Sequence, residues 1–257
     1  MVKQFFKMNL QEQSQLLLRG GNVPTYAYVP VHGITEDELI LRILPPWSSK
    51  GLVFQVLPIH WFGKDESRMG VICRRHFRSR CYICEALNNL VVSGVSKDVL
   101  KNYYAKNRAF CNAIDVTRPE KIEEGVKIFS LPLKKVALAM LEHAKENGDF
   151  TDPEEGYPFK IVRERQGVYP DYKVVPLLGK QKRYDSGIDW DNITLYNLDD
   201  FENVFKVHSY EEQKELWEVY SDLVGSVSNN TLDEMVNSLH KKDGVEFDDL
   251  KLMGLDE

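Results

Sequence analysis

The sequence lacks the features that would place the protein in a membrane, in a secretory pathway or in a common enzyme class. No run approaches the roughly 18 consecutive apolar residues of a membrane span, so we predict no membrane partner. The N-terminus turns polar at Asn9, before the apolar core of a signal peptide could form, and we expect a cytoplasmic protein. The sequence contains no phosphate-binding glycine loop, no G-x-S-x-G motif and no H-E-x-x-H motif. The sequence therefore predicts a protein that is not an enzyme.

Cysteine is also scarce, and its few copies are unevenly placed. Three of the four cysteines are Cys73, Cys81 and Cys84. In a reducing compartment thiols favour metal over disulfides, and the two-residue gap between Cys81 and Cys84 lets two thiolates hold one tetrahedral zinc ion. The remaining Cys111 lies in an apolar run and is expected to be a buried small hydrophobe. The stretch from His60 to Cys84 is thus the predicted zinc site.

The spacing leaves the fourth zinc ligand open between two histidines. His76 would complete a compact Cys-x2-His-x4-Cys-x2-Cys knuckle and is slightly favoured, because local ligands close smaller loops at lower entropic cost. The alternative is His60, at the end of a predicted strand and twelve intervening residues before Cys73. Three thiolates and one imidazole saturate the metal, so the zinc is predicted to be structural, and a zinc-dependent hydrolase is disfavoured.

Charge is divided unevenly along the chain. Residues 185–257 carry 19 acidic and 5 basic groups, whereas residues 1–184 carry 20 acidic and 28 basic groups. A basic body with an acidic C-terminal region is typical of nucleic-acid binders whose tail competes with the phosphate backbone. The alternative is a region of ordinary, solvated acidic helices.

The hydrophobic pattern predicts a mainly β protein with helices, of the α+β class. Short runs with strand texture, separated by turn residues, lie at 38–44, 52–57, 109–116, 126–132, 157–165 and 172–178. Helices are expected at 96–106, 133–146 and 211–224. Because strands and helices do not alternate steadily, a small closed barrel is favoured over a parallel α/β sheet.

Changes in composition suggest how the chain is divided. We predict an N-terminal arm at 1–21, a core at 22–183 that contains a zinc subdomain at about 60–107, and an acidic, partly helical C-terminal region at 184–257. The last part of that region, 245–257, alternates acids with apolar residues and is expected to be disordered when free.

Cations and aromatic rings recur beside the predicted strands and within the zinc loop. Proteins hold a nucleic-acid single strand by neutralising its backbone and by stacking its bases, the latter worth about 1–3 kcal/mol per base. Taken singly, such a residue is more often a solvated charge or a core ring, but their recurrence indicates a nucleic-acid interface. The candidate contacts are Arg42, Trp61, Arg74, Arg75, Tyr103, Lys106, Arg108, Phe110, Lys134, Arg163, Tyr169 and Tyr172.

Several motifs occur together in chain order. They are Leu41-Arg42-Ile43-Leu44-Pro45, then His60-x12-Cys73 with Cys81-x2-Cys84, then Phe110-Cys111-Asn112-Ala113-Ile114. In this combination the chain resembles the helix-destabilising, single-stranded DNA-binding proteins of the T-even type of tailed phages. The likeness covers roughly residues 38–178, and it extends loosely to the helix around residues 212–218 and to the acidic end at 248–250.

The resemblance implies an OB-fold core with an inserted zinc subdomain that binds single-stranded DNA without sequence preference. The implied setting is DNA replication, recombination or repair, in the cytoplasm of an infected host cell if a phage encodes the protein. The resemblance favours His60 over His76, and it places Arg42, Lys106 and Phe110 on the DNA cleft. Tyr172 is a further implied cleft position.

The resemblance also implies that the acidic tail recruits replication and recombination proteins and masks the cleft. Two departures stand out: the interval from Cys73 to Cys81 is shorter than in the family, and the arm lacks its basic cooperativity motif. The alternative to this interpretation is a zinc-containing RNA-binding or transcription-regulatory protein.

Overall fold

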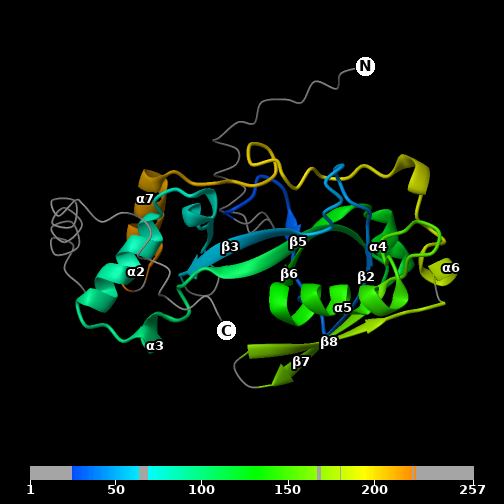
Figure 1. The fold of residues 1–257 in the computed structure, drawn as a ribbon, viewed down its shortest axis with the longest axis horizontal. Coiled ribbons are helices and arrows are strands. Elements are labelled where there is room, and N and C mark those ends of the chain that lie inside the picture. Colours follow the sequence, from blue (N-terminus) through cyan, green and yellow to red (C-terminus); the bar gives the residue numbers. More distant parts are fainter. Residues whose placement is uncertain (1–24, 64–68, 167–168, 180, 222, 224–257) are drawn as a thin grey trace, which may run out of the picture.

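The computed structural model describes residues 25–63, 69–166, 169–179, 181–221 and 223. Within them the chain has a mixed α+β fold built on one sheet, as the sequence predicts. Figure 1 shows an elongated molecule, with the sheet running through it and helices α2, α3 and α7 gathered at one end. The arm at 1–21 and the segment 245–257 lie outside the described residues, and the division of the chain near residue 184 stays a prediction.

The central strand of the sheet is β5 (Lys106–Asp115). Along one edge it pairs with β6 (Lys127–Pro132), and along the other with β3 (Gln55–Phe62) over its first half and β2 (Glu38–Ile43) over its second half. Beyond these lie β4 (Met69–Ile72) on β3, the hairpin of β7 (Phe159–Gln166) and β8 (Tyr169–Pro176) on β2, and the short parallel strand β1 (Val31–His32) on β6. Strand β5 therefore joins the body of the sheet to the β3–β4 pair.

Both faces of β2 and β5 are covered, which explains their unbroken runs of buried residues. One face packs against a π-helical turn (η3, Leu133–Ala137) and helix α5 (Leu138–Asn147), through Val136 and Met140. The helix expected at 133–146 is thus confirmed.

An extended segment, residues 185–208, covers the other face and is called the strap here (Figure 1). Leu198 and Phe205 of the strap are fully buried. The Asn112 side chain of β5 binds the main chain of the strap through two hydrogen bonds. Its Nδ2–H donates to the Tyr196 carbonyl over 2.9 Å, and the Tyr196 N–H donates to its Oδ1 over 3.0 Å. An amide side chain thus replaces the hydrogen bonds that a neighbouring strand would supply, so the strap is part of the packed body.

The remaining helices are short. They are η2 (Arg74–Phe77), α2 (Tyr82–Val92), α3 (Lys97–Leu100), α4 (Pro119–Glu123), α6 (Gln181–Tyr184), η4 (Trp190–Asn192) and α7 (Tyr210–Tyr220). In the described part of the chain, none of the helices combines the length and the apolar character that crossing a membrane requires.

The helix expected at 96–106 is wrong beyond Leu100. Leu100 is the one buried residue of α3, and beyond it Tyr103 packs against Trp217 without continuing the helix. Helix α7 starts at a capping box of Ser209 and Glu212 and ends at Tyr220, four residues before the predicted end.

Candidate functional site

Four side chains from separate elements meet in the candidate metal centre. His60 lies on β3, Cys73 follows β4, Cys81 precedes α2, and Cys84 belongs to the first turn of α2. Their ligand atoms all lie within 4.8 Å of one another, and the His60 ring is completely buried. His76, which spacing alone favours, is instead exposed, with its ring against Phe77.

The geometry of the four ligand atoms fits a tetrahedral ion. Zn–S bonds of about 2.3 Å and Zn–N bonds of about 2.0 Å place tetrahedral ligand atoms roughly 3.5–3.8 Å apart. The Sγ atoms of Cys73 and Cys84 are 3.6 Å apart, and Nε2 of His60 lies 3.6 Å from Sγ of Cys81 and 3.4 Å from Sγ of Cys84. The residues present therefore fit a metal ion.

The other ring nitrogen of His60 fixes how the imidazole faces the cysteines. Nδ1 lies 2.9 Å from the main-chain oxygen of Tyr103, to which it donates its proton. Nε2 is then left as the atom that faces the thiols, with its lone pair free for a metal. This backing by a carbonyl is the usual arrangement behind a metal-bound histidine.

Electrostatics in the cluster favour a cation at its centre. Hydrogen bonds with Cys73 and Cys84 lower the pKa of the Cys81 thiol. Hydrogen bonds with Cys73 and Cys81 raise the pKa of the Cys84 thiol. Burial lowers the pKa of His60, but its hydrogen bonds with Cys73 and Cys81 outweigh burial and raise it to about 10. Without a metal ion, a proton on His60 is thus the positive partner of the buried thiolate. A bound divalent cation would replace that proton and leave Nε2 as a ligand.

A second group of predicted residues gathers at the start of β5. Arg108 is held by two hydrogen bonds, from Nε to the Ser130 hydroxyl (3.1 Å) and from Nη2 to the Ser130 carbonyl (2.6 Å). Burial lowers the pKa of Arg108, and the Tyr26 and Tyr172 hydroxyls lie close enough to oppose this. Because arginine stays protonated at neutral pH, Arg108 is a fixed cation beside two rings. The Tyr26 ring in turn meets Trp61 edge-on, with centroids 5.7 Å apart.

Other candidates flank this group or lie on the metal module. Lys106 and Lys134 are exposed, and Arg163, which pairs across the hairpin with Tyr172, donates from Nη1 to the Thr35 carbonyl. Arg75 is exposed on η2, Arg74 is half-buried there, and Tyr103 packs edge-on against Trp217. Tyr169 begins β8, and nothing is described of its side chain.

Arg42 and Phe110 are placed differently from the cleft positions that the resemblance implies. Both are fully buried under the strap side of the sheet. Nε of Arg42 donates to Asp185 over 3.0 Å, and the guanidinium also donates to the Phe150 and Asp152 carbonyls. In this structure both residues stabilise the fold, and a direct DNA contact by either residue stays a prediction.

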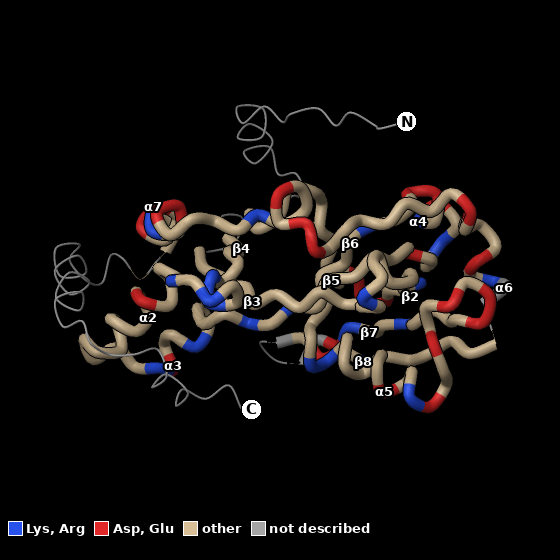
Figure 2. The backbone as a smooth tube through the Cα atoms, turned by 45° about the horizontal axis from the view of Figure 1, so that its top comes forward, with Lys and Arg blue, Asp and Glu red and all other residues tan. Residues whose placement is uncertain are grey.

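The charges on the molecule are segregated. Figure 2 shows Lys and Arg beside α3 and along β5 and β7, whereas Asp and Glu gather on the strap and around α4 and α6. Lys97 on α3 and Lys101 directly after it are exposed basic residues that the sequence argument missed. Their signal was weak, because two lysines on and beside a short helix are typical of any solvated surface.

A comparison with protein-family models gives one match. The family described as "gp32 DNA binding protein like" matches residues 36–219. The chain belongs to the gp32-like DNA-binding protein family. This confirms the family resemblance found in the motifs, and no curated protein matches the chain.

The match to the gp32-like family spans the sheet from β2, the His60 and cysteine cluster, the strap and most of α7. Both candidate groups described above, except Tyr26, thus lie within the part of the chain that the family shares. A DNA-binding protein is therefore the activity class to which this fold and these residues belong.

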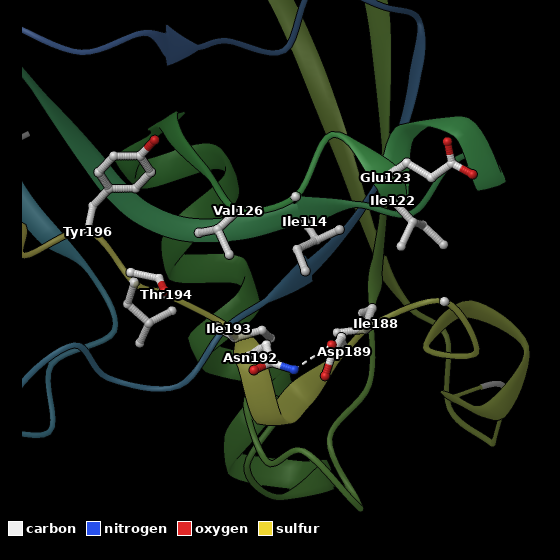
Figure 3. Close-up of a pocket in the computed structure, with 13 residues that line it drawn as sticks. Ile114, Ile122, Glu123, Val126, Ile188, Asp189, Asn192, Ile193, Thr194 and Tyr196 are labelled. Carbon is white, nitrogen blue, oxygen red and sulfur yellow. Dashed lines mark hydrogen bonds between the residues drawn. The ribbon is translucent and has the colours of Figure 1, made fainter.

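A hollow elsewhere in the molecule is unconnected with either group. It has a volume of about 530 Å³ and lies between the strap and the turn after α4. Figure 3 shows aliphatic side chains around it, among them Ile122, Ile188 and Ile193, with Asp189 and Glu123 at the edge. None of the residues predicted to bind DNA or metal lines this hollow.

Proposed function

We propose that this protein binds single-stranded DNA without sequence preference, through the basic and aromatic side of the sheet. The family match carries the proposal, since it makes DNA the ligand. Arg108 lies within electrostatic reach of Tyr26 and Tyr172, and Trp61 packs edge-on against Tyr26; this grouping of a cation with rings supports the single-strand form. The partly exposed rings of Trp61 and Tyr172 can stack on unpaired bases, whereas the bases of a duplex are already stacked on one another.

The proposed contact surface takes its cations from three places. Lys106 and Arg108 lie on β5, Lys134 lies at the start of η3, and Arg163 with Tyr172 lies on the β7–β8 hairpin. Arg74 and Arg75 extend the surface on the metal module. Backbone neutralisation by this set, without a groove shaped for particular base edges, accounts for binding that does not depend on sequence.

We further propose that the metal is zinc and that it is structural. Three thiolates and one imidazole complete the four-coordinate shell that zinc prefers in structural sites, so no position is left for substrate. Zinc supplies the cross-link: His60 and Cys73 would tie β3 and β4 to Cys81 and Cys84 of α2. The protein then acts by binding rather than by catalysis.

The wider roles follow from the family. We infer that the sheet is an OB-type barrel and that the protein coats single strands during DNA replication, recombination or repair, in the cytoplasm, which is that of an infected host cell if a phage encodes the protein. The shared central strand, paired with β3 and then β2 along one edge, supports the barrel. The acidic region beyond residue 224 is the proposed contact for replication and recombination proteins.

Titration with oligo-dT of about 20 nucleotides tests the binding activity. We expect quenching of tryptophan fluorescence, with the Trp61→Phe variant losing most of the signal, and weaker binding to the matched RNA. Replacing Lys106 and Lys134 by Ala should flatten the dependence of log affinity on log salt by about 1.4, since each lost phosphate contact contributes about 0.7 on single strands.

Lys145→Ala is the matched control for the lysine variants, because Lys145 is exposed near the end of α5, pairs with Glu142 and is not among the proposed contact residues. Its salt dependence should equal that of the wild type. If oligo-dT leaves the fluorescence unchanged, the proposal fails. If RNA binds more tightly than DNA, the protein is an RNA binder.

Removal of residues 245–257 should tighten DNA binding at low salt. The acidic side chains of this segment, which lies outside the described residues, would compete with phosphates for the same cations. Because salt screens both polyanions, the difference should shrink as salt rises. Affinity measured at two salt concentrations checks this, and unchanged or weaker binding at low salt would argue against masking.

A further inference from the structure

Helix α7 comes late in the chain, yet it contacts the residues beside the metal ligands. The key side chain is Gln213, which is completely buried. Its Oε1 accepts the main-chain N–H of Tyr82 over 3.1 Å, and its Nε2–H donates to the main-chain oxygen of Ile72 over 3.2 Å. Tyr82 directly follows Cys81, and Ile72 directly precedes Cys73. One amide therefore spans the main chains that carry two of the ligands.

The helix α2 needs such a partner at its start. The first N–H groups of a helix have no acceptor within it, and Cys81, the residue before α2, makes no side-chain capping bond. Gln213 supplies the missing acceptor to Tyr82. A glutamine from another helix thus caps the turn whose thiols face the metal.

A second residue of α7 holds the outer side of the same turn. Tyr210 donates its hydroxyl to Glu85 over 2.7 Å, and Arg80, which stacks on the Tyr210 ring at 4.7 Å, donates to both oxygens of Glu85. Arg80 precedes Cys81 and Glu85 follows Cys84. The segment that carries both cysteines is therefore held at its two ends.

The histidine side of the site is held by Trp217. Its ring is buried between Phe62 and Tyr103, with centroids 5.4 and 6.1 Å away. Tyr103 provides the carbonyl that accepts the Nδ1 proton of His60. Helix α7 thus contacts a chain neighbour or hydrogen-bond partner of every ligand.

We propose that α7 is an outer brace of the metal site, with Gln213 as its positioning residue. The inference rests on the proposed metal function. The coupling between two binding events is reciprocal. If the packing of α7 raises the affinity of the site for metal, bound metal must stabilise the packing of α7 to the same extent. The strap ends where α7 begins, so the metal also fixes the end of the strap, 120 residues or more from its ligands in the chain.

Gln213→Met tests the brace, because it keeps the length of the side chain and removes both hydrogen bonds. Outer residues of this kind typically change metal affinity by about 10–100-fold. We expect a loss of that size when zinc is titrated against a chromophoric chelator, and a changed visible spectrum when cobalt(II) replaces zinc. Gln213→Glu, which keeps the acceptor and loses the donor, should lose less affinity if it folds.

Two controls separate positioning from general stability. Glu215→Ala changes an exposed residue of the same helix and should leave zinc affinity at the wild-type value. Val136→Ala weakens the core under the sheet, far from the metal, and should lower the unfolding temperature without altering the cobalt spectrum. Wild-type affinity in folded Gln213→Met would overturn the inference.

A measurement on the unmodified chain guards against variants that do not fold. Removing zinc with a chelator should speed hydrogen exchange of the α7 amides at least tenfold, while those of α5 stay as they were. Unchanged exchange in α7 would also overturn the brace. Failure of the chain to bind zinc at all would instead remove the proposed metal function, which the direct zinc titration reports separately.

Discussion

Purified Cys84→Ser protein should retain almost no zinc. A serine hydroxyl stays protonated at neutral pH and does not replace a thiolate, so the ion would keep three ligands and an open position. Structural zinc sites contribute to folding directly, with apparent binding free energies of about 10–16 kcal/mol in small zinc-finger peptides. Metal analysis of the purified variant measures the loss, and thermal unfolding followed by tryptophan fluorescence measures its effect on the module.

The module should loosen rather than unfold completely without its metal. Phe62, Leu87 and Trp217 are buried together in one apolar cluster, without an ion in contact with them. Part of the stability of this end of the molecule therefore comes from ordinary apolar packing. We expect a lower unfolding temperature for the module and a largely unchanged sheet.

Cys111→Ser is the matched control, since it makes the same chemical change in a different place. Cys111 is fully buried in the core under β5, where burial raises its pKa and a hydroxyl costs about 1–3 kcal/mol unless it is hydrogen-bonded. This variant should lose stability and keep its zinc. Full zinc occupancy in Cys84→Ser would refute the ligand assignment.

The same assay decides between the two histidines. His60→Ala should lose zinc as Cys84→Ser does, because it removes the nitrogen that lies 3.4–3.6 Å from two sulfurs. His76→Ala should retain zinc, because its side chain is exposed on η2. The opposite result would place the fourth ligand inside the loop.

The cysteines of the metal site could be predicted from the sequence, but the histidine could not be chosen by spacing. Loop-closure entropy favours His76 only if metal binding itself has to bring the fourth ligand close to the cysteines. In the structure β3 and β4 already pair, with His60 opposite Val71, so the sheet brings His60 to the neighbourhood of Cys73 before any metal binds. A rule based on ligand spacing does not include such strand pairing.

The fold was predictable where the hydrophobic pattern is strong. In residues 133–146 the apolar residues recur with helical spacing. In the β7–β8 hairpin, strand-forming residues lie on both sides of a turn. The strap was not predictable, because its buried apolar residues, such as Leu198 and Phe205, are widely spaced among acidic residues and form no helical or strand pattern. Its docking also depends on Asn112, whose amide looks like any polar residue in a strand.

Arg42→Met should lower the free energy of unfolding by about 3–5 kcal/mol, the usual result of removing one partner from a buried ion pair. Arg42 is fully buried, and it joins Asp185 of the strap to the Phe150 and Asp152 carbonyls. Burial raises the pKa of Asp185 despite the attraction of the guanidinium, so desolvation is the larger effect on this carboxyl. The pair itself then adds little net stability, but leaving its carboxyl and the carbonyls without a donor is costly.

Urea unfolding of Arg42→Met measures the effect, with Lys145→Met as the control for an exposed cation. Lys145 pairs with Glu142 in contact with solvent, where ion pairs are worth about 0–1 kcal/mol. The DNA affinity of folded Arg42→Met decides the remaining question about this residue. If Arg42 holds the fold, affinity should stay within about twofold of wild type, because a buried cation neutralises no phosphate. A large loss of affinity without a loss of stability would show instead that the strap opens and that Arg42 contacts DNA.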